Sequence, residues 1–303
     1  MQEGVDVSIK GVCPVLAVPF TVDGRVDYES FRGLCRWIIG LNTNSVLLFG
    51  VGSENIKLND EERIQLLDIL LSEREGTSLK VVTSIADHSS ELAVLRAKKY
   101  EEMGVDFINI LPPTFFSPSN EQINFHISQV LRSVKLPVIV QHLPQAGGST
   151  NLAEILDLTT EHDNLKIIKC EANPPTESIR TVHETTSGRV RTLIGWGGIC
   201  WSEGVDAGAD GLQPGSAMTD LYLWAQKSLD KGDRAEFEAR ISRFIPRIAN
   251  WISNLEQLIA AEKYILMRRG IIATGYCRTP TIALNPAIVE EIAHILQLCE
   301  EIA

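Results

Sequence analysis

The chain alternates short apolar runs with longer stretches in which apolar residues recur every three or four positions. The runs are rich in β-branched residues and have the length of strands, whereas the recurring pattern is typical of amphipathic helices. The runs cover residues 15–18, 45–49, 80–85, 107–111, 137–141, 165–169, 191–195 and, more weakly, 209–213. Because strands that alternate with helices pair in parallel, the pattern predicts a parallel sheet with helical connections.

Eight such runs favour an α/β fold, the closed (β/α)8 TIM barrel, over an open sheet. The runs are apolar on both faces, as in a sheet that helices cover. After residue 215 the strand-like runs stop, and residues 233–270 and 287–302 show helical patterns. We therefore expect a (β/α)8 barrel domain over residues 1–220 and a C-terminal helical extension over residues 221–303.

The pattern also predicts individual helices. Residues 91–103 form one of them, and Gly104 follows as its C-cap. Residues 60–74 form another, with Asp60 as the expected N-cap. The residues expected on the apolar face of the first helix are Leu92, Leu95, Tyr100 and Met103.

The charge and the composition of the chain limit the kinds of molecule that it is expected to bind. The formal net charge is −11 and the isoelectric point is near 5.1, which argues against nucleic acid and membranes as partners. Residues 1–10 contain no basic segment followed by an apolar run, and no apolar run approaches the ~20 residues that span a bilayer, so we expect a cytoplasmic protein. The six cysteines are scattered without zinc-like spacing, and we expect no metal.

Barrel enzymes place their active sites at the carboxyl ends of the strands, so the residues that end the runs are the candidates for chemistry. The run 165–169 ends in Lys169. An ammonium group at the rim of an apolar barrel is poorly hydrated, which favours the neutral amine that can attack a ketone. Alternatively, Lys169 is a lysine whose charge simply reaches solvent. Lys166 is a weaker candidate, because it lies within the run and on the opposite face of the strand.

The loop 50–54 after the second run has small residues that let backbone N–H groups approach an anion. Val51 and Gly52 lie at its centre, and Ser53 adds a hydroxyl that can donate a hydrogen bond. These features suit the carboxylate of a substrate. An ordinary turn between a strand and a helix would have a similar composition.

Two further strand ends carry candidate substrate contacts. The fifth run ends at Gln141 and is followed by His142, whose imidazole normally titrates near neutrality. A packed or solvent-facing histidine is the alternative. The seventh run ends at Gly195 and is followed by Trp196. This pair either leaves open space beside a ligand or forms a tight turn with a packed tryptophan.

Together these segments resemble the dihydrodipicolinate synthase/N-acetylneuraminate lyase family over nearly the whole chain. The matching segments are 11–20, 23–27, 50–54, 58–63, 113–118, 137–144 and 167–169. The resemblance implies a barrel with C-terminal helices, a homotetramer, a small 2-oxo acid as substrate and chemistry without a cofactor. It also implies that Lys169 forms a Schiff base and that the loop 50–54 holds the carboxylate of a pyruvate-like group.

Departures from the family pattern concern the substrate. The loop of the family reads Gly-Thr-Thr-Gly-Glu or Gly-Ser-Thr-Gly-Glu, whereas here Val51 and Gly52 replace the two hydroxyl residues and Ser53 replaces the glycine. The catalytic tyrosine of the family falls at Phe115, whose ring cannot relay a proton. The arginine that dihydrodipicolinate synthases use falls at Ala146. These losses argue against dihydrodipicolinate synthesis.

Four local patterns are similar to the branch of the family that includes 2-keto-3-deoxy-L-arabinonate dehydratase. The patterns are Ser53-Glu54, Gln141–Pro144, Lys169-Cys170-Glu171 and Trp196-Gly197-Gly198. The branch implies a lyase, either a dehydratase or an aldolase, that acts on a 2-keto-3-deoxy sugar acid.

The missing tyrosine leaves the acid/base group open. With Phe115 at that position, Ser53, His142, Thr114 or a bound water must serve in an enzyme of this mechanism. The alternative hypothesis is a protein of this family that binds a 2-oxo acid without efficient turnover, with Phe115 contacting the ligand. A metal-dependent barrel enzyme is disfavoured, because no carboxylate and histidine set gathers at the strand ends.

Overall fold

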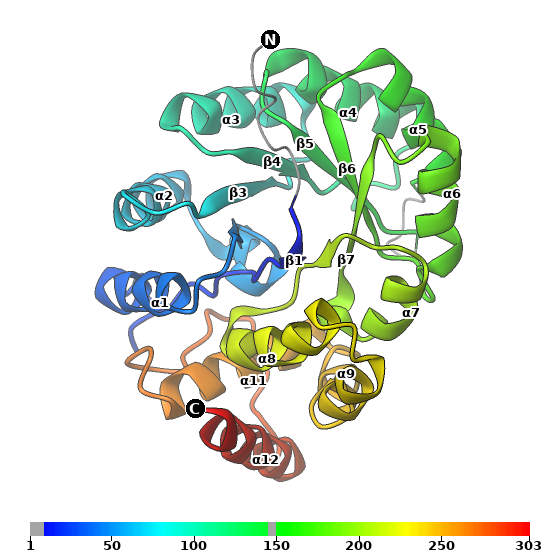
Figure 1. Ribbon diagram of the computed structural model, residues 1–303. Coiled ribbons are helices and arrows are strands. Elements are labelled where there is room, and N and C mark those ends of the chain that lie inside the picture. Colours follow the sequence, from blue (N-terminus) through cyan, green and yellow to red (C-terminus); the bar gives the residue numbers. More distant parts are fainter. Residues whose placement is uncertain (1–8, 145–149) are drawn as a thin grey trace. The chain divides into compact units, whose positions relative to one another are not determined.

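The computed structural model describes residues 9–144 and 150–303. Its eight strands form one sheet with the order β1-β8-β7-β6-β5-β4-β3-β2, and the pairs from β3 to β8 are parallel (Figure 1). From β2 to β8 each strand lies beside its neighbours in sequence, and β1 lies beside β8. This order is that of a (β/α)8 barrel and confirms the predicted fold class.

The strands agree with the apolar runs except at the N-terminus. They are β1 (Gly11–Val12), β2 (Ser45–Leu48), β3 (Lys80–Ile85), β4 (Phe107–Ile110), β5 (Val138–His142), β6 (Leu165–Cys170), β7 (Arg191–Ile194) and β8 (Gly211–Leu212). The first predicted run, 15–18, is wrong as a strand, because only Val15 pairs there, through isolated bridges to Leu47 and Gly215. Pro14 and Pro19 border this run and have no N–H to continue a ladder.

Helices connect the strands and follow the last of them. They are α1 (Tyr28–Gly40), α2 (Asp60–Glu73), α3 (Ser90–Met103), α4 (Asn120–Ser133), α5 (Leu152–Glu161), α6 (Thr176–Thr186), α7 (Trp201–Asp206), α8 (Thr219–Asp230), α9 (Arg234–Ile241), α10 (Ile245–Trp251), α11 (Leu255–Arg268) and α12 (Pro286–Ile302). Short 3₁₀ turns are η1 (Val51–Ser53), η2 (Asn55–Lys57), η3 (Trp196–Gly198) and η4 (Ser216–Met218). Residues 213–303, all of them described, contain no strand, as the pattern predicts.

Two details of the helices differ from the prediction. The N-cap of α2 is Asn59 rather than Asp60. The Asn59 side chain accepts a hydrogen bond from the Glu62 N–H, and the Glu62 carboxylate accepts one from the Asn59 N–H. In α3, Leu92 and Leu95 are exposed. The buried residues of that helix are Ala93, Ala97 and Tyr100. The prediction is right for Tyr100, and the two alanines take the inner positions expected for the leucines, which lets α3 approach β3 and α4 closely.

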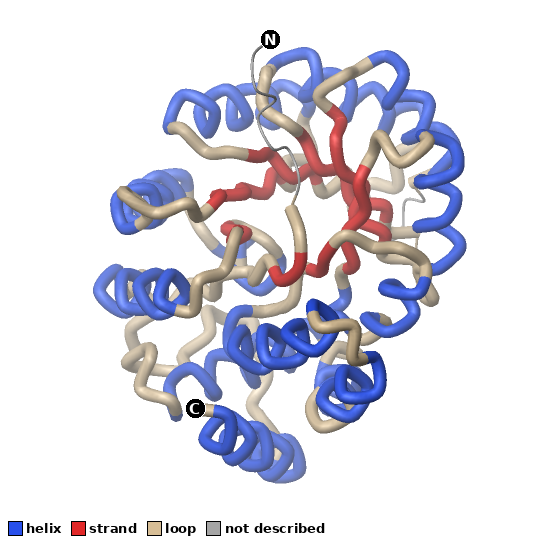
Figure 2. The backbone as a smooth tube through the Cα atoms, in the orientation of Figure 1, coloured by secondary structure: helices blue, strands red, loops and turns tan. Residues whose placement is uncertain are grey.

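The described residues divide into two compact units. Unit 1 comprises residues 9–11, 80–144, 150–195 and 200–212, and unit 2 comprises Val12–Leu79, Trp196–Ile199 and Gln213–Ala303. In unit 1, helices α3 to α6 flank the strands β3 to β7 (Figures 1 and 2). Unit 2 contains β2, α1, α2 and the helices from α8 onward. The domain boundary near residue 220 stays a prediction.

Within the described ranges, no helix combines the length and the apolar character that crossing a bilayer requires.

Candidate active site

Four neighbouring strands of unit 1 carry polar side chains on one face. Ser84 on β3 pairs in register with Asn109 on β4, and Gln141 on β5 pairs with Lys169 on β6. Asn109 also pairs with Ile139, two residues before Gln141, so all four polar side chains point to the same side of the sheet. Every one of them is buried. Buried polar groups in an apolar sheet need hydrogen-bond partners, and Asn109 supplies them by donating to Ser84 and Gln141.

A carboxylate lies beside the predicted Schiff-base lysine. Nζ of Lys169 is 3.3 Å from Oε1 of Glu171, and each of the two side chains is only 8% exposed. Gln141 donates from Nε2 to Oε2 of Glu171 at 2.9 Å. The expectation that poor hydration alone governs Lys169 is therefore incomplete. A proton acceptor is in direct contact with the amine, and an acceptor of this kind is what an amine needs to become a nucleophile.

The end of β7 makes room for this carboxylate. A Cβ atom built on Gly195 would lie 1.8 Å from Oε1 and 2.4 Å from Cδ of Glu171. Leu193, two residues earlier, pairs with Lys169, so Gly195 continues the face that carries the lysine. The structure thus brings Lys169, Gln141 and Gly195 together around one carboxylate, as three of the predicted site residues.

Glu171 and Asn109 are functional candidates that the sequence reasoning did not place in the site. The signal for Glu171 is its spacing from Lys169, since residues two apart on a strand share a face. The signal for Asn109 is an amide inside the apolar strand Phe107–Ile110. Both signals become specific only once the strand register is known.

His142 lies on the other face of the sheet from Lys169. It ends β5 and pairs with Cys170, whereas Gln141 pairs with Lys169. Its Nδ1 has no hydrogen-bond partner among the described residues, and burial lowers the pKa of the imidazole. His142 is therefore neutral at physiological pH. Its predicted contact with the substrate stays a prediction that the register does not favour.

In unit 2, Val51–Ser53 forms the 3₁₀ turn η1. The fully buried Ser53 donates from Oγ to the Leu16 carbonyl at 2.6 Å and accepts from the Phe49 N–H at 3.1 Å. These bonds shape the turn, and the catalytic role of Ser53 stays a prediction. Among the described residues, the N–H groups of Val51 and Gly52 make no hydrogen bond, as donors that await an anion would.

A buried ion network fixes the end of this turn. Glu54 has a left-handed backbone, with φ of 50°, and its carboxylate contacts Lys57 at 3.0 Å and Lys263 of α11. Nζ of Lys263 also lies 4.0 Å from the centre of the Phe20 ring. Burial lowers the pKa of Lys263, and the Glu54 carboxylate opposes that shift. The turn is thus tied to a helix more than two hundred residues later in the chain.

The segment after β7 is a tight turn in unit 2. Trp196 and Gly197 both have left-handed backbones, with φ of 50° and 57°. Tyr222 donates a hydrogen bond to the Gly197 carbonyl, and a Cβ on Gly197 would lie 2.8 Å from the Ile248 side chain. Of the two interpretations of this segment, the turn is present. The predicted contact between Trp196 and a ligand stays a prediction.

The position that the family fills with tyrosine carries an exposed phenyl ring. Phe115 is 80% exposed, and its ring lies 6.4 Å from that of His88 and 5.1 Å from that of Phe116. Ala146, the position of the synthase arginine, lies outside the described residues. The role of Phe115 in ligand binding stays a prediction.

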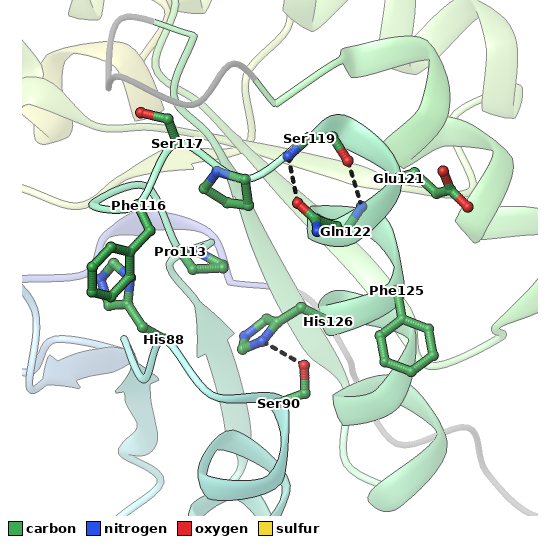
Figure 3. A pocket seen from close by; sticks show the side chains of 11 residues that line it. His88, Ser90, Pro113, Phe116, Ser117, Ser119, Glu121, Gln122, Phe125 and His126 are labelled. Carbon is green, nitrogen blue, oxygen red and sulfur yellow. Dashed lines mark hydrogen bonds between the residues drawn. The ribbon is translucent and has the colours of Figure 1, made fainter.

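Near this segment, unit 1 has an open pocket of about 730 Å³ (Figure 3). Phe116 and Phe125 line it together with His126, whose Nδ1 shares a hydrogen bond with Ser90 at 3.1 Å. Its lining includes no predicted site residue, so this pocket is distinct from the surroundings of Lys169. Over the two described ranges, no group of three or more His, Cys, Asp or Glu side chains is arranged to hold a metal ion.

Comparison with known sequences yields one family. The sequence profile of the dihydrodipicolinate synthetase family matches residues 8–298. A 4-hydroxy-tetrahydrodipicolinate synthase of Chlorobaculum parvum is 30% identical over 192 residues. That alignment covers 63% of this chain and 64% of the relative, just under two thirds of its length.

Solved structures share the fold over nearly the whole chain. Dihydrodipicolinate synthase from Rhodopseudomonas palustris superposes with a TM-score of 0.86 at 21% identity, covering 95% of this chain and 97% of that one. N-acetylneuraminate lyase from Mycoplasma synoviae superposes with a TM-score of 0.82 at 17% identity, with the same coverage of 95% and 97%. At these identities the likeness shows the fold, and it agrees with the barrel and its C-terminal helices.

Proposed function

We propose, because the chain belongs to the dihydrodipicolinate synthetase family, that it is a lyase of the class I aldolase type in which Lys169 forms a Schiff base with a 2-oxo acid. The observation that carries this proposal is the buried contact of 3.3 Å between Lys169 and Glu171. A nucleophilic amine and a proton acceptor in contact with it are the two groups that imine formation needs.

The first step in this mechanism transfers a proton from the Lys169 ammonium to Glu171. The transfer converts the ion pair into a neutral amine and a neutral carboxylic acid, and the neutral amine is the nucleophile. The amine then attacks C2 of the 2-oxo acid, so that a C–N bond forms, the C=O π bond breaks, and the oxygen takes up a proton from the attacking nitrogen. Glu171 returns its proton to that oxygen, which leaves as water. The product is the iminium on Lys169.

The iminium withdraws electrons from C3 and makes its hydrogen acidic. Removal of that proton, with loss of the C4 hydroxyl as water, gives a dehydratase. Removal of the C4 hydroxyl proton, with cleavage of the C3–C4 bond, gives an aldolase. Either route needs a general base, and Glu171 is the carboxylate nearest to the imine nitrogen. In this proposal Glu171 serves as the acid/base group, the role that the tyrosine has in other members of the family.

The carboxylate of the substrate binds, in this proposal, to the backbone N–H groups of Val51 and Gly52. Their lack of hydrogen-bond partners among the described residues supports this role. Ser53 keeps the turn in shape through its bonds to Leu16 and Phe49. Gln141, in contact with Glu171, is the further polar group offered to the substrate.

The substrate class that we propose is a 2-keto-3-deoxy sugar acid. It rests on the Lys-x-Glu pattern that Lys169 and Glu171 form and on the phenyl group of Phe115, which removes the proton relay of the synthases. From the family resemblance we further infer a homotetramer in the cytoplasm. The exposed rings of Phe115 and Phe116 support association, since a second copy of the chain would cover them.

Trapping the imine tests the proposal. The protein is incubated with saturating pyruvate and sodium borohydride, and its peptides are analysed by mass spectrometry. We expect a reduced pyruvate adduct on Lys169 in the wild type and in Lys166→Met, but not in Lys169→Met. Lys166 is the matched control because it lies on the same strand and on the opposite face. A wild-type protein without the adduct would end the proposal.

Binding of a 2-oxo acid without turnover is the second candidate, and the exposed phenyl group of Phe115 favours it. A panel of 2-keto-3-deoxy sugar acids separates the two, with pyruvate release and water elimination as readouts. Turnover of any member supports the lyase. An adduct on Lys169 with no turnover of any member supports the binding protein, and a gain of cleavage in Phe115→Tyr would show that the hydroxyl alone is missing.

A further inference from the structure

A row of side-chain amides leads to Glu171 from three strands away. Asn109 on β4 donates from Nδ2 to Oγ of Ser84 at 2.8 Å and to Oε1 of Gln141 at 3.4 Å. Gln141 on β5 donates in turn from Nε2 to Oε2 of Glu171 at 2.9 Å. The row thus crosses β3, β4, β5 and β6 and ends at the carboxylate that faces Lys169.

The charge at the end of the row sets the direction of every bond in it. An ionised carboxylate only accepts hydrogen bonds, so Gln141 must turn its NH₂ group toward Glu171. Its carbonyl oxygen then faces Asn109, and Asn109 must present its own NH₂ group. In agreement with this order, Oδ1 of Asn109 has no hydrogen-bond partner among the described residues. Leaving this acceptor unpaired in a fully buried residue destabilises the folded protein, because the oxygen loses its hydrogen bonds to water.

Within this row, the orientation of each amide depends on the hydrogen bonds already described. Gln141 is anchored by Glu171 on one side and by Asn109 on the other. Removing Asn109 leaves the carbonyl of Gln141 without its donor, and the long side chain can then rotate away from Glu171. Gln141 donates to the second oxygen of the Glu171 carboxylate, so that rotation removes one of the contacts that orient the carboxylate beside Lys169.

We propose that Asn109 is a positioning residue, which acts through Gln141 to hold the Glu171 carboxylate against Lys169. The inference rests on the proposed function, since it concerns the proton transfer that starts imine formation. Asn109 touches neither the lysine nor the carboxylate in the contacts described, so its effect is on the rate of proton transfer and not on the affinity for the 2-oxo acid. A displacement of an acid/base group by a fraction of an ångström is enough to slow such a step.

The test measures the rate of imine formation in the full-length protein. Protein and pyruvate are mixed rapidly and quenched with borohydride at set times, and the adduct on Lys169 is quantified. Asn109→Leu has a similar shape without donors, and Gln141→Met has a similar shape without the amide. We expect each to lower the maximum rate about tenfold or more. For Asn109→Leu, the half-saturating pyruvate concentration stays within about twofold of the wild type.

The double variant separates positioning from a general effect on the core. If Asn109 acts through Gln141, then Asn109→Leu in the Gln141→Met background causes no further loss. Losses that multiply in the double variant, or a normal rate in Asn109→Leu, overturn the inference. Thr83→Val is the control, because Thr83 is equally buried on β3 and its hydroxyl has no partner among the described residues. We expect it to retain the wild-type rate.

A variant that does not fold is replaced by a milder one. Asn109→Ser removes the donor that reaches Gln141 while keeping a small polar group, and circular dichroism and thermal unfolding establish that it is folded. The same rate loss is expected for it, and a normal rate overturns the inference. A wild-type protein that forms no adduct contradicts the proposed function itself, whereas a wild-type adduct with normal rates in both Asn109 variants contradicts only the positioning role.

Discussion

The carboxylate of Glu171 fills the space that a Cβ atom on Gly195 would need, with Oε1 only 1.8 Å from that position. Gly195, the residue that follows β7, is therefore glycine because a side chain there would collide with Glu171, which follows β6. Any side chain at this position must move the carboxylate away from Lys169, or move the end of β7.

Gly195→Ala tests this relationship. We expect the variant to lose imine formation about tenfold or more, because Glu171 is displaced from the amine. Overpacking should also lower the free energy of unfolding by about 1–3 kcal/mol. The control is Gly40→Ala at the end of α1, where a Cβ meets nothing within 4 Å. Equal rates of borohydride trapping in the wild type and in Gly195→Ala would contradict the assignment.

Glu171→Gln removes the proton acceptor and keeps the shape of the side chain. We expect imine formation to slow by about two orders of magnitude, the usual loss when a general acid/base is removed. Binding of pyruvate, followed by calorimetry, should change much less. The control is Glu177→Gln on α6, which alters the net charge equally at an exposed position. A trapping rate in Glu171→Gln equal to that of this control would exclude Glu171 from the proton transfer.

Glu262 on α11 should make stability depend on pH. Burial raises the pKa of this carboxyl to about 8 in the folded protein, from a usual value of 4.5. Because the folded value is raised, the favourable contribution is complete below pH 4.5 and is lost as the pH rises through 8. The free energy of unfolding should fall over this window by a few kcal/mol more in the wild type than in Glu262→Gln. Denaturant unfolding at pH 5 and pH 8.5 measures the difference, and parallel curves for the two proteins would refute it.

Breaking the pair between Lys263 and Glu54 should destabilise the protein strongly, since both side chains are fully buried. Lys263→Met leaves Glu54 with Lys57 as its remaining cation, and we expect a loss of about 3 kcal/mol in the free energy of unfolding. The matched control is Arg243→Met, which breaks an exposed pair with Glu301. We expect that variant to unfold close to the wild type. A similar midpoint for both variants in guanidinium chloride would show that burial does not strengthen the pair.

Much of the fold is predictable from the sequence because its strands are short β-branched runs between amphipathic helices. The prediction over 80–85 agrees with β3 at both ends. It is wrong at 15–18, where the residues are equally apolar but prolines interrupt the ladder that a strand needs. For the inner face of α3 it is right at Tyr100 but wrong at Leu92 and Leu95, because leucine spacing does not reveal that the helix also packs through alanines.

The candidate site is less predictable, because its contacts depend on the register between strands. Lys169 is a candidate because of its place at the end of a run, and the register shows that Gln141 lies beside it. Alternation within β5 shows that Gln141 and His142 face opposite sides, and the register adds that His142 is the one on the far side from Lys169. Asn109 and Gln141 are 32 residues apart in the chain, and only the alignment of β4 with β5 brings their amides together.

The link between Glu54 and α11 limits how far this protein can be shortened. A chain that stopped after α8 would retain every strand, yet it would lack the cation from Lys263 and the backbone carbonyls of Arg278 and Pro280, which accept hydrogen bonds from Lys57. The Glu54 carboxylate, in the loop after β2, would then keep only Lys57 of the two cations that contact it, and Lys57 would have lost two of its hydrogen-bond acceptors. Engineering a minimal version of this barrel therefore requires a new support for that loop and not merely removal of the final helices.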